Sequence, residues 1–77
     1  MVHKVIPKPS FLDTCIYVKT LGNHKLWRSI DAKRYYTWDT LHGEIEVFNK
    51  RGKHIGAADV LTGEFTKPAV RGRKIDV

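Results

Sequence analysis

The stretch that decides the fold lies at residues 35–48 and reads YYTWDTLHGEIEVF. Apolar and polar residues alternate on both sides of its centre, as they do in strands, where successive side chains point to opposite faces of a sheet. If Asp39 faces His42 across a two-residue turn, the two halves pair as an antiparallel hairpin. The expected pairs are Trp38 with Gly43, Thr37 with Glu44, Tyr36 with Ile45 and Tyr35 with Glu46. Because Thr40-Leu41 is not a favoured turn sequence, this register is a hypothesis.

The hairpin separates an apolar face from a polar one. The apolar face carries Tyr36, Trp38, Ile45 and Val47, which suit a core. The polar face carries Tyr35, Thr37, Asp39, His42, Glu44 and Glu46. Three of the eight acidic residues of the chain therefore gather around one histidine, in a protein whose net charge is +6. This concentration makes the polar face the first place to look for chemistry.

Short runs of aromatic and β-branched residues continue around the hairpin, separated by turn signals at residues 31–33, 49–52 and 61–63. The expected strands are 34–38, 43–48, 54–57 and 64–67, followed by a basic tail at 68–77. The pattern predicts an α+β fold that is mostly β, a highly twisted antiparallel sheet with a short N-terminal helical segment.

The N-terminal part admits two interpretations. Ser10 followed by Asp13 has the pattern of a helix N-cap, and Gly22 suits a C-terminal stop, so a helix with a one-sided apolar stripe is favoured between them. The β-branched residues Ile16, Val18 and Thr20 equally suit a short strand. The helix is the prediction, and the strand is the alternative.

Size and charge limit the function classes. A chain of 77 residues makes one domain, and its longest apolar run, at residues 15–18, is far too short to cross a bilayer. The single cysteine, Cys15, excludes an intramolecular disulfide and a Cys-x-x-Cys zinc site. Fourteen Lys and Arg against eight Asp and Glu favour a polyanionic partner such as nucleic acid, although solubility alone is the simpler explanation.

Three hypotheses compete for the polar face of the hairpin. It is an ordinary solvated strand face, or His42, Glu44 and Glu46 bind a divalent ion, or a carboxylate and His42 perform acid–base catalysis. RNA suits catalysis, because its own 2′-hydroxyl attacks the adjacent phosphate once a base removes the proton. Glu46 or Asp39 would then be the base, His42 the acid, and Arg71 or Arg73 the cation beside the phosphate.

The same residues resemble a known family. Trp38-Asp39, two residues, His42-Gly43-Glu44, one residue and Glu46 are similar to the signature of the cytotoxic ribonuclease domain of the ribosome-inactivating colicins and cloacin. Trp27 upstream and Arg73 near the end also match, so the resemblance covers about two thirds of the chain. One departure is Phe48, which stands where the family pattern has a tyrosine.

The resemblance implies an endoribonuclease that needs no metal or other cofactor and cuts small-subunit (16S) ribosomal RNA at the decoding site, which stops translation. It implies that Glu46 is the general base, His42 the general acid and Arg73 the group that stabilises the transition state, with Asp39 assisting proton transfer and Glu44 supporting the site. It also implies two partners, the ribosome and an acidic immunity protein, which the positive charge suits.

The division of the chain follows from the same resemblance. Residues 1–77 form a single cytotoxic domain, with 1–26 as a variable N-terminal segment and 27–77 as the catalytic sheet and basic tail. Basic side chains near the tail and the 49–52 turn would bind RNA: Lys50, Arg51, Lys53, Arg71 and Lys74. A toxin of this kind would be delivered by its producer, act in the target-cell cytoplasm and have no stable membrane association.

Three rivals remain at this point, of which the weakest is a small structural subunit that would leave ribosomes and RNA unchanged. A non-catalytic RNA- or ribosome-binding β-domain would use the same positive charge without needing His42 and Glu46 together. A metal-dependent nuclease toxin would lose its activity in a chelator.

Overall fold

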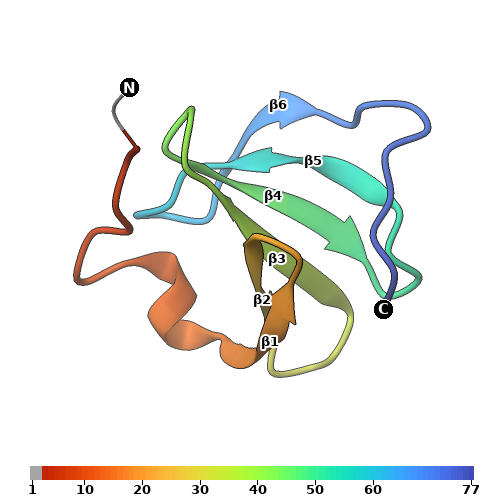
Figure 1. Cartoon of the computed structure of the whole chain (residues 1–77), viewed down its shortest axis with the longest axis horizontal. Helices are drawn as coiled ribbons and strands as arrows, with labels where there is room; N and C mark the ends of the chain where they lie inside the picture. The colour runs from red at the N-terminus through yellow and green to blue at the C-terminus, as the bar shows by residue number, and fades with distance from the viewer. Residues whose placement is uncertain (1–2) are drawn as a thin grey trace.

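The computed structural model describes residues 3–77, which form one antiparallel sheet preceded by a single helical turn (Figure 1). The turn, η1, spans Phe11–Thr14. The strands are β1 (Ile16–Leu21), β2 (His24–Arg28), β3 (Arg34–Asp39), β4 (Glu44–Asn49), β5 (His54–Ala58) and β6 (Phe65–Pro68). Each strand pairs with the next along the chain, in the order β1 to β6. The predicted mostly-β antiparallel fold is confirmed, and the four expected strands agree with β3 to β6 to within one residue at each end. No helix within residues 3–77 is long and apolar enough to span a membrane.

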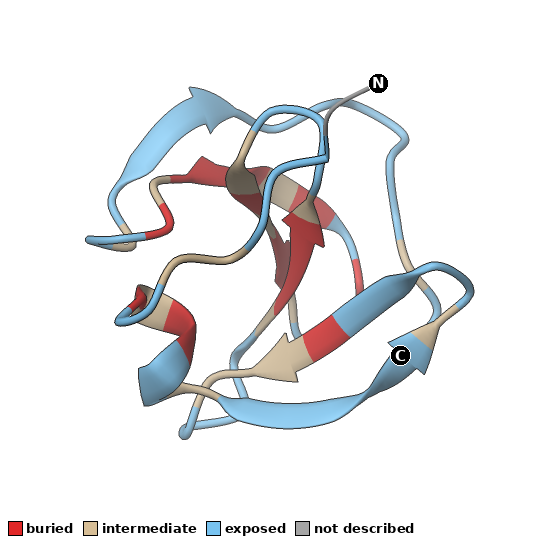
Figure 2. Cartoon of the chain, turned by 60° about the vertical axis from the view of Figure 1, so that its left-hand side comes forward, coloured by how far each residue is buried: buried red, intermediate tan, exposed pale blue. Residues whose placement is uncertain are grey.

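The main core lies on the face predicted to be apolar. Tyr36, Trp38, Ile45 and Val47 are buried there, with Ile45 and Val47 completely inaccessible to solvent. Leu12 of η1 packs against the same cluster, and the Phe11 ring meets Tyr36 edge-on at 5.5 Å. Figure 2 shows that burial concentrates in the central strands, whereas β1 and β6 at the two edges are largely exposed. The short helical turn therefore covers the centre of the sheet.

The predicted N-terminal helix is wrong beyond its first turn. Ser10 and Asp13 do form the capping box, but the helix is a 3₁₀ turn that ends at Thr14. The next residues form β1, in which Ile16 pairs with Arg28 and Tyr17 with Trp27 of β2. β-Branched side chains favour the extended backbone, and here pairing with a neighbouring strand outweighs the weak helical pattern. The sheet therefore begins at Ile16, upstream of the residue 27 expected from the sequence.

The predicted hairpin register is wrong by two residues, but its two faces are correct. Asp39 pairs with Glu44, and Thr37 pairs with Glu46. Four residues, 40–43, form the turn, with the Gly43 amide donating to the Asp39 carbonyl at 2.9 Å and Gly43 at φ +70°. Because side chains alternate with a period of two, a shift of two residues leaves every side chain on its expected face.

The opposite face of the sheet has a second, smaller set of buried residues. Leu26, Phe48, His54 and Ala57 are each at most 4% exposed there. The C-terminal segment runs along this end of the sheet beside β5 (Figure 1), held by hydrogen bonds from the His54 amide to the Arg73 carbonyl and from the Ile75 amide to the Gly52 carbonyl. This attachment brings the basic tail onto the polar face.

Candidate active site

A hollow of about 220 Å³ lies on the polar face, between β3, β4, β5, β6 and the tail. Of the two arginines considered as the catalytic cation, Arg73 lines this hollow and Arg71 does not. The ionisable residues in its walls are the four other residues that the sequence singled out for catalysis, Arg73 and two further residues: Asp39, His42, Glu44, Glu46, Arg73, His54 and Lys67. Strands β3 and β4 supply the carboxylates, the turn between them supplies His42, and the tail supplies Arg73. Residues up to 34 positions apart in the chain thus meet in one small space.

His42 and Asp39 form an exposed pair at the turn. Nδ1 of His42 lies 2.7 Å from Oδ2 of Asp39, and the His42 side chain is 55% exposed. The other carboxylate oxygen accepts the backbone amides of Leu41 and His42, at 2.9 and 3.1 Å. Asp39 therefore shapes the turn and orients the imidazole, leaving Nε2 of His42 as the atom that a substrate can reach.

These contacts favour the ionised form of Asp39. Partial burial raises the pKa of Asp39, but the hydrogen bonds from the His42 side chain and from the amides of His42 and Leu41 outweigh it, so the pKa lies below its ordinary value. An ionised Asp39 can stabilise a positively charged imidazole. This is the arrangement that a histidine needs in order to carry a proton that it later gives up.

Glu46 occupies the centre of the site and is bound on both oxygens. Oε1 accepts from Arg73 Nη1 at 2.8 Å, and Oε2 lies 2.7 Å from Nε2 of His54. Each carboxylate oxygen has two acceptor positions, so both retain capacity for a further proton. Its side chain is 19% exposed and does not point into the hydrophobic core. Glu46 is therefore held in a fixed orientation by its two partners and remains accessible to a substrate.

The hydrogen bonds of His54 fix which nitrogen carries its proton. Nδ1 accepts the backbone amide of Val70 at 2.8 Å, and a backbone amide can only donate. The proton of the neutral ring must then sit on Nε2, where it donates to Glu46. The His54 side chain is 1% exposed. His54 thus ties the central carboxylate to the tail that carries Arg73.

Glu44 has a different set of partners. Its Oε1 lies 2.5 Å from Lys67 Nζ, and its Oε2 accepts from the Thr66 hydroxyl at 2.9 Å. The hydrogen bond from Lys67, followed in size by an opposing contribution from burial, leaves the pKa of Glu44 below its ordinary value. Both partners lie on β6, so this pair joins β4 to the edge strand across the mouth of the hollow. His42, Glu44 and Glu46 each bind a different side chain, and no set of three His, Cys, Asp or Glu residues within 3–77 is arranged as a metal site.

Gly52 positions the tail. Its φ is +85°, and a Cβ built there would lie 2.2 Å from the Ile75 carbonyl oxygen. Only glycine allows the tail to approach the β4–β5 turn this closely. Arg73 lies two residues before Ile75 in the tail. The close contact at Gly52 therefore helps to position the Arg73 guanidinium beside Glu46.

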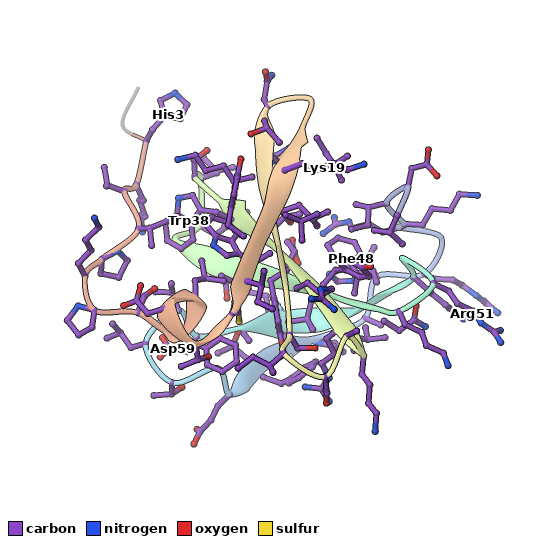
Figure 3. All side chains as sticks on the ribbon, turned by 90° about the horizontal axis from the view of Figure 1, so that it is seen from below. His3, Lys19, Trp38, Phe48, Arg51 and Asp59 are labelled. Carbon is purple, nitrogen blue, oxygen red and sulfur yellow. The ribbon has the colours of Figure 1, made fainter. Side chains whose placement is uncertain are left out.

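The residues predicted to bind RNA lie on the exposed surface of the tail and the β4–β5 turn: Lys50, Arg51, Lys53, Arg71 and Lys74. Lys53 and Lys74 are paired in an isolated β-bridge, so the basic turn and the basic tail lie side by side. Figure 3 shows Arg51 at the opposite end of the molecule from His3 and far from Trp38. Trp38 is 7% exposed and donates from its indole nitrogen to the Lys4 carbonyl at 3.0 Å, which confirms that it belongs to the core.

Two residues of the site were missed by sequence reasoning. His54 has no acidic neighbour at a useful spacing in the chain, and Lys67 falls at the end of an expected strand. Strand pairing could have indicated Lys67, because in the observed sheet Ala57 pairs with both Glu46 and Lys67. That pairing depends on bulges in the β4–β5 and β5–β6 ladders, which the sequence does not mark.

The comparison with known protein families gives a match to the family described as Cytotoxic, over residues 14–76. The chain belongs to the Cytotoxic family, that of the colicin-type cytotoxic ribonuclease domains. Colicin E3 of Escherichia coli is 36% identical to this cytotoxic domain over 47 residues, which are 60% of the chain but 8% of the length of colicin E3. The resemblance carried by the His-Gly-Glu-x-Glu segment is thereby confirmed. The match also includes residues 14–26, which the sequence had not aligned with the family.

Proposed function

We propose that this cytotoxic domain is a bacterial toxin endoribonuclease that cuts small-subunit ribosomal RNA at the decoding site and so blocks translation. The observation that carries the proposal is the convergence of His42–Asp39, Glu46 and Arg73 in one hollow on a domain with a net charge of +6. A base, an acid and a cation are what cleavage by an RNA 2′-hydroxyl requires. Membership of the Cytotoxic family supports the same class of activity.

Glu46 is the general base of the proposed reaction. It takes the proton of the 2′-hydroxyl, whose oxygen attacks the adjacent phosphorus while the bond from phosphorus to the 5′-oxygen breaks. His42 gives a proton from Nε2 to the departing 5′-oxygen, and the products are a 2′,3′-cyclic phosphate and a 5′-hydroxyl. The nucleophile belongs to the substrate, so the chemistry needs no metal-bound water.

The remaining side chains prepare these two groups. Asp39 holds Nδ1 of His42 and favours the imidazolium that donates the proton. Arg73, now 2.8 Å from Glu46, is the cation available to the phosphate as negative charge builds on its oxygens. Glu44 and Lys67 hold β6 at the mouth of the hollow. Lys50, Arg51, Lys53, Arg71 and Lys74 supply phosphate contacts outside the reacting centre.

The biological setting forms part of the proposal. The substrate is the intact ribosome, and the producing cell protects itself with an acidic immunity protein that is attracted to the positive surface. The domain is delivered by its producer and acts in the cytoplasm of the target cell.

The test is to incubate the protein with intact bacterial ribosomes in a chelator and to map the 3′ fragments of the small-subunit RNA. We expect one new fragment, beginning at the decoding site. Glu46→Gln should give none, while the matched variant Glu64→Gln, which changes an exposed glutamate outside the hollow, should cut normally. Intact RNA with the unaltered protein would refute the nuclease. Cleavage that occurs only without chelator would refute the metal-independent mechanism, and a cut elsewhere would refute the proposed target.

A further inference from the structure

A second hollow, of about 300 Å³, adjoins the first along the Glu46–Arg73 pair. Those two residues belong to the walls of both hollows, whereas His42 lines only the first. The second hollow is completed from both ends of the sheet, by the β1–β2 hairpin on one side and the tail on the other. Its remaining walls are Leu21, His24, Thr37, Phe48 and Ile75.

The chemistry of this second hollow differs from that of the first. Its floor includes Phe48, which is 2% exposed, and its sides include the half-buried Leu21 and Ile75. Thr37, which is 7% exposed, adds a side-chain hydroxyl to the lining. His24 adds an exposed ring at the rim. A largely apolar lining with one hydroxyl and one imidazole suits a planar, partly polar ring.

The position of the second hollow relative to the reacting groups indicates which nucleobase of the RNA it would bind. In the proposed reaction, Glu46 takes the proton of the attacking 2′-hydroxyl and His42 protonates the departing oxygen. The nucleotide that carries the 2′-hydroxyl must therefore lie on the Glu46 side, and its partner on the His42 side. The second hollow begins at Glu46 and extends away from His42.

We propose that the second hollow binds the nucleobase of the nucleotide whose 2′-hydroxyl attacks, that is, the base on the 5′ side of the cut. Leu21, Phe48 and Ile75 contact its faces, and the Thr37 hydroxyl and His24 contact its polar edge. This inference rests on the proposed nuclease function and adds a selecting site to it. It also gives the β1–β2 hairpin a direct role in substrate choice.

The experiment uses short RNAs with the decoding-site sequence in which a single base is removed and the ribose retained. Removing the base 5′ of the cut should lower kcat/KM by about 10- to 100-fold, as expected where a bound base loses its stacking contacts. Removing the base 3′ of the cut should have a smaller effect. Thr37→Val, which keeps the side-chain shape, and His24→Ala, at an exposed position, should each reduce the penalty for losing the 5′ base.

A binding measurement separates failure of this inference from failure of the nuclease proposal. Fluorescence anisotropy with the same RNAs, made uncleavable by a 2′-deoxy substitution at the attacking nucleotide, should show the same dependence on the 5′ base. If the intact RNAs are cut but neither cleavage nor binding depends on that base, the base site is wrong and the nuclease stands. If binding depends on the 5′ base and no RNA or ribosome is cut, the nuclease is wrong. A penalty that persists unchanged in both variants would also overturn the assignment to this hollow.

Discussion

The molecule contains two histidine–carboxylate pairs that have the same nitrogen–oxygen distance but differ in their exposure to solvent. His42 and Asp39 lie 2.7 Å apart, as do His54 and Glu46, but the His42 side chain is 55% exposed and that of His54 is 1% exposed. The second nitrogen of His54 is occupied by the Val70 amide, whereas that of His42 makes no hydrogen bond within residues 3–77. A short distance alone does not identify an acid–base pair. What decides the role is whether the far nitrogen can meet a substrate.

The two pairs also differ in how the chain brings them together. His42 and Asp39 are three residues apart on one turn, so their contact is local. His54 reaches Glu46 across the β4–β5 pairing and reaches Val70 in the tail, so its contacts depend on the complete fold. Loss of the His42 side chain should therefore affect chemistry alone, and loss of the His54 side chain should affect chemistry through structure.

Among the variants that test this contrast, His42→Ala should have the largest effect on cleavage. Removal of the proposed general acid should lower the cleavage rate by about 10²- to 10⁴-fold. Because the ring is exposed, the free energy of unfolding should change by less than about 0.5 kcal/mol. Ribosome cleavage rates and urea unfolding check the two parts, with His3→Ala, another exposed histidine, as the control. A variant that cuts at the normal rate would remove His42 from the mechanism.

His54→Ala should lower both stability and cleavage. It leaves a space in a buried site and deprives Glu46 and the Val70 amide of their partner, so the free energy of unfolding should fall by about 2–4 kcal/mol. Urea unfolding measures this loss, and cleavage assayed well below the unfolding midpoint measures the effect on the folded site. If the variant proved as stable as the unaltered protein, the contrast between the two pairs would fail.

Gly52→Ala tests the attachment of the tail without touching an ionisable residue. The added methyl group cannot fit 2.2 Å from the Ile75 carbonyl oxygen, so the tail must move. Arg73 would then no longer be positioned to contact Glu46. We expect about a 10-fold or greater loss of cleavage, in the range found when a transition-state donor is misplaced, and faster hydrogen exchange at the Ile75 amide.

Gly72→Ala is the matched control for the tail. Gly72 has nearly the same φ, +83°, and a Cβ there would meet no atom within 4 Å. The two variants share the cost of a left-handed backbone, and only Gly52→Ala adds the collision. Equal losses of cleavage in both would mean that strain, and not tail position, accounts for the effect.

The sequence predicts the parts of this arrangement that depend on local contacts, and it does not predict the parts that depend on long-range contacts. The signature from Asp39 to Glu46 identifies the acidic face, because period-two alternation survives even a register error of two residues. Ile16 to Leu21 was mispredicted because a capping box and β-branched residues conflict locally, and strand pairing with β2 decides between them. His54 could not be found, since its partners come from another strand and from the tail. Local patterns thus predict the reacting groups better than the groups that hold them.

The smallest effect is expected from Lys67→Met, which removes the partner of Glu44 from the edge strand. The hydrogen bond from Lys67 is the main cause of the lowered pKa of Glu44, so this pKa should rise toward its ordinary value of 4.5, as measured by carboxyl-carbon NMR titration. A carboxyl group whose pKa is lowered by folding stabilises the protein above its unfolded pKa, and this contribution disappears as the pH falls through the folded value. The stability difference between the unaltered protein and Lys67→Met should therefore be present at pH 7 and shrink below about pH 4.5. Lys19→Met, which removes an exposed lysine from β1, should leave the Glu44 titration unchanged. An unshifted Glu44 in Lys67→Met would mean that the pair across the mouth of the hollow does not persist in solution, and that Glu44 supports the site in some other way.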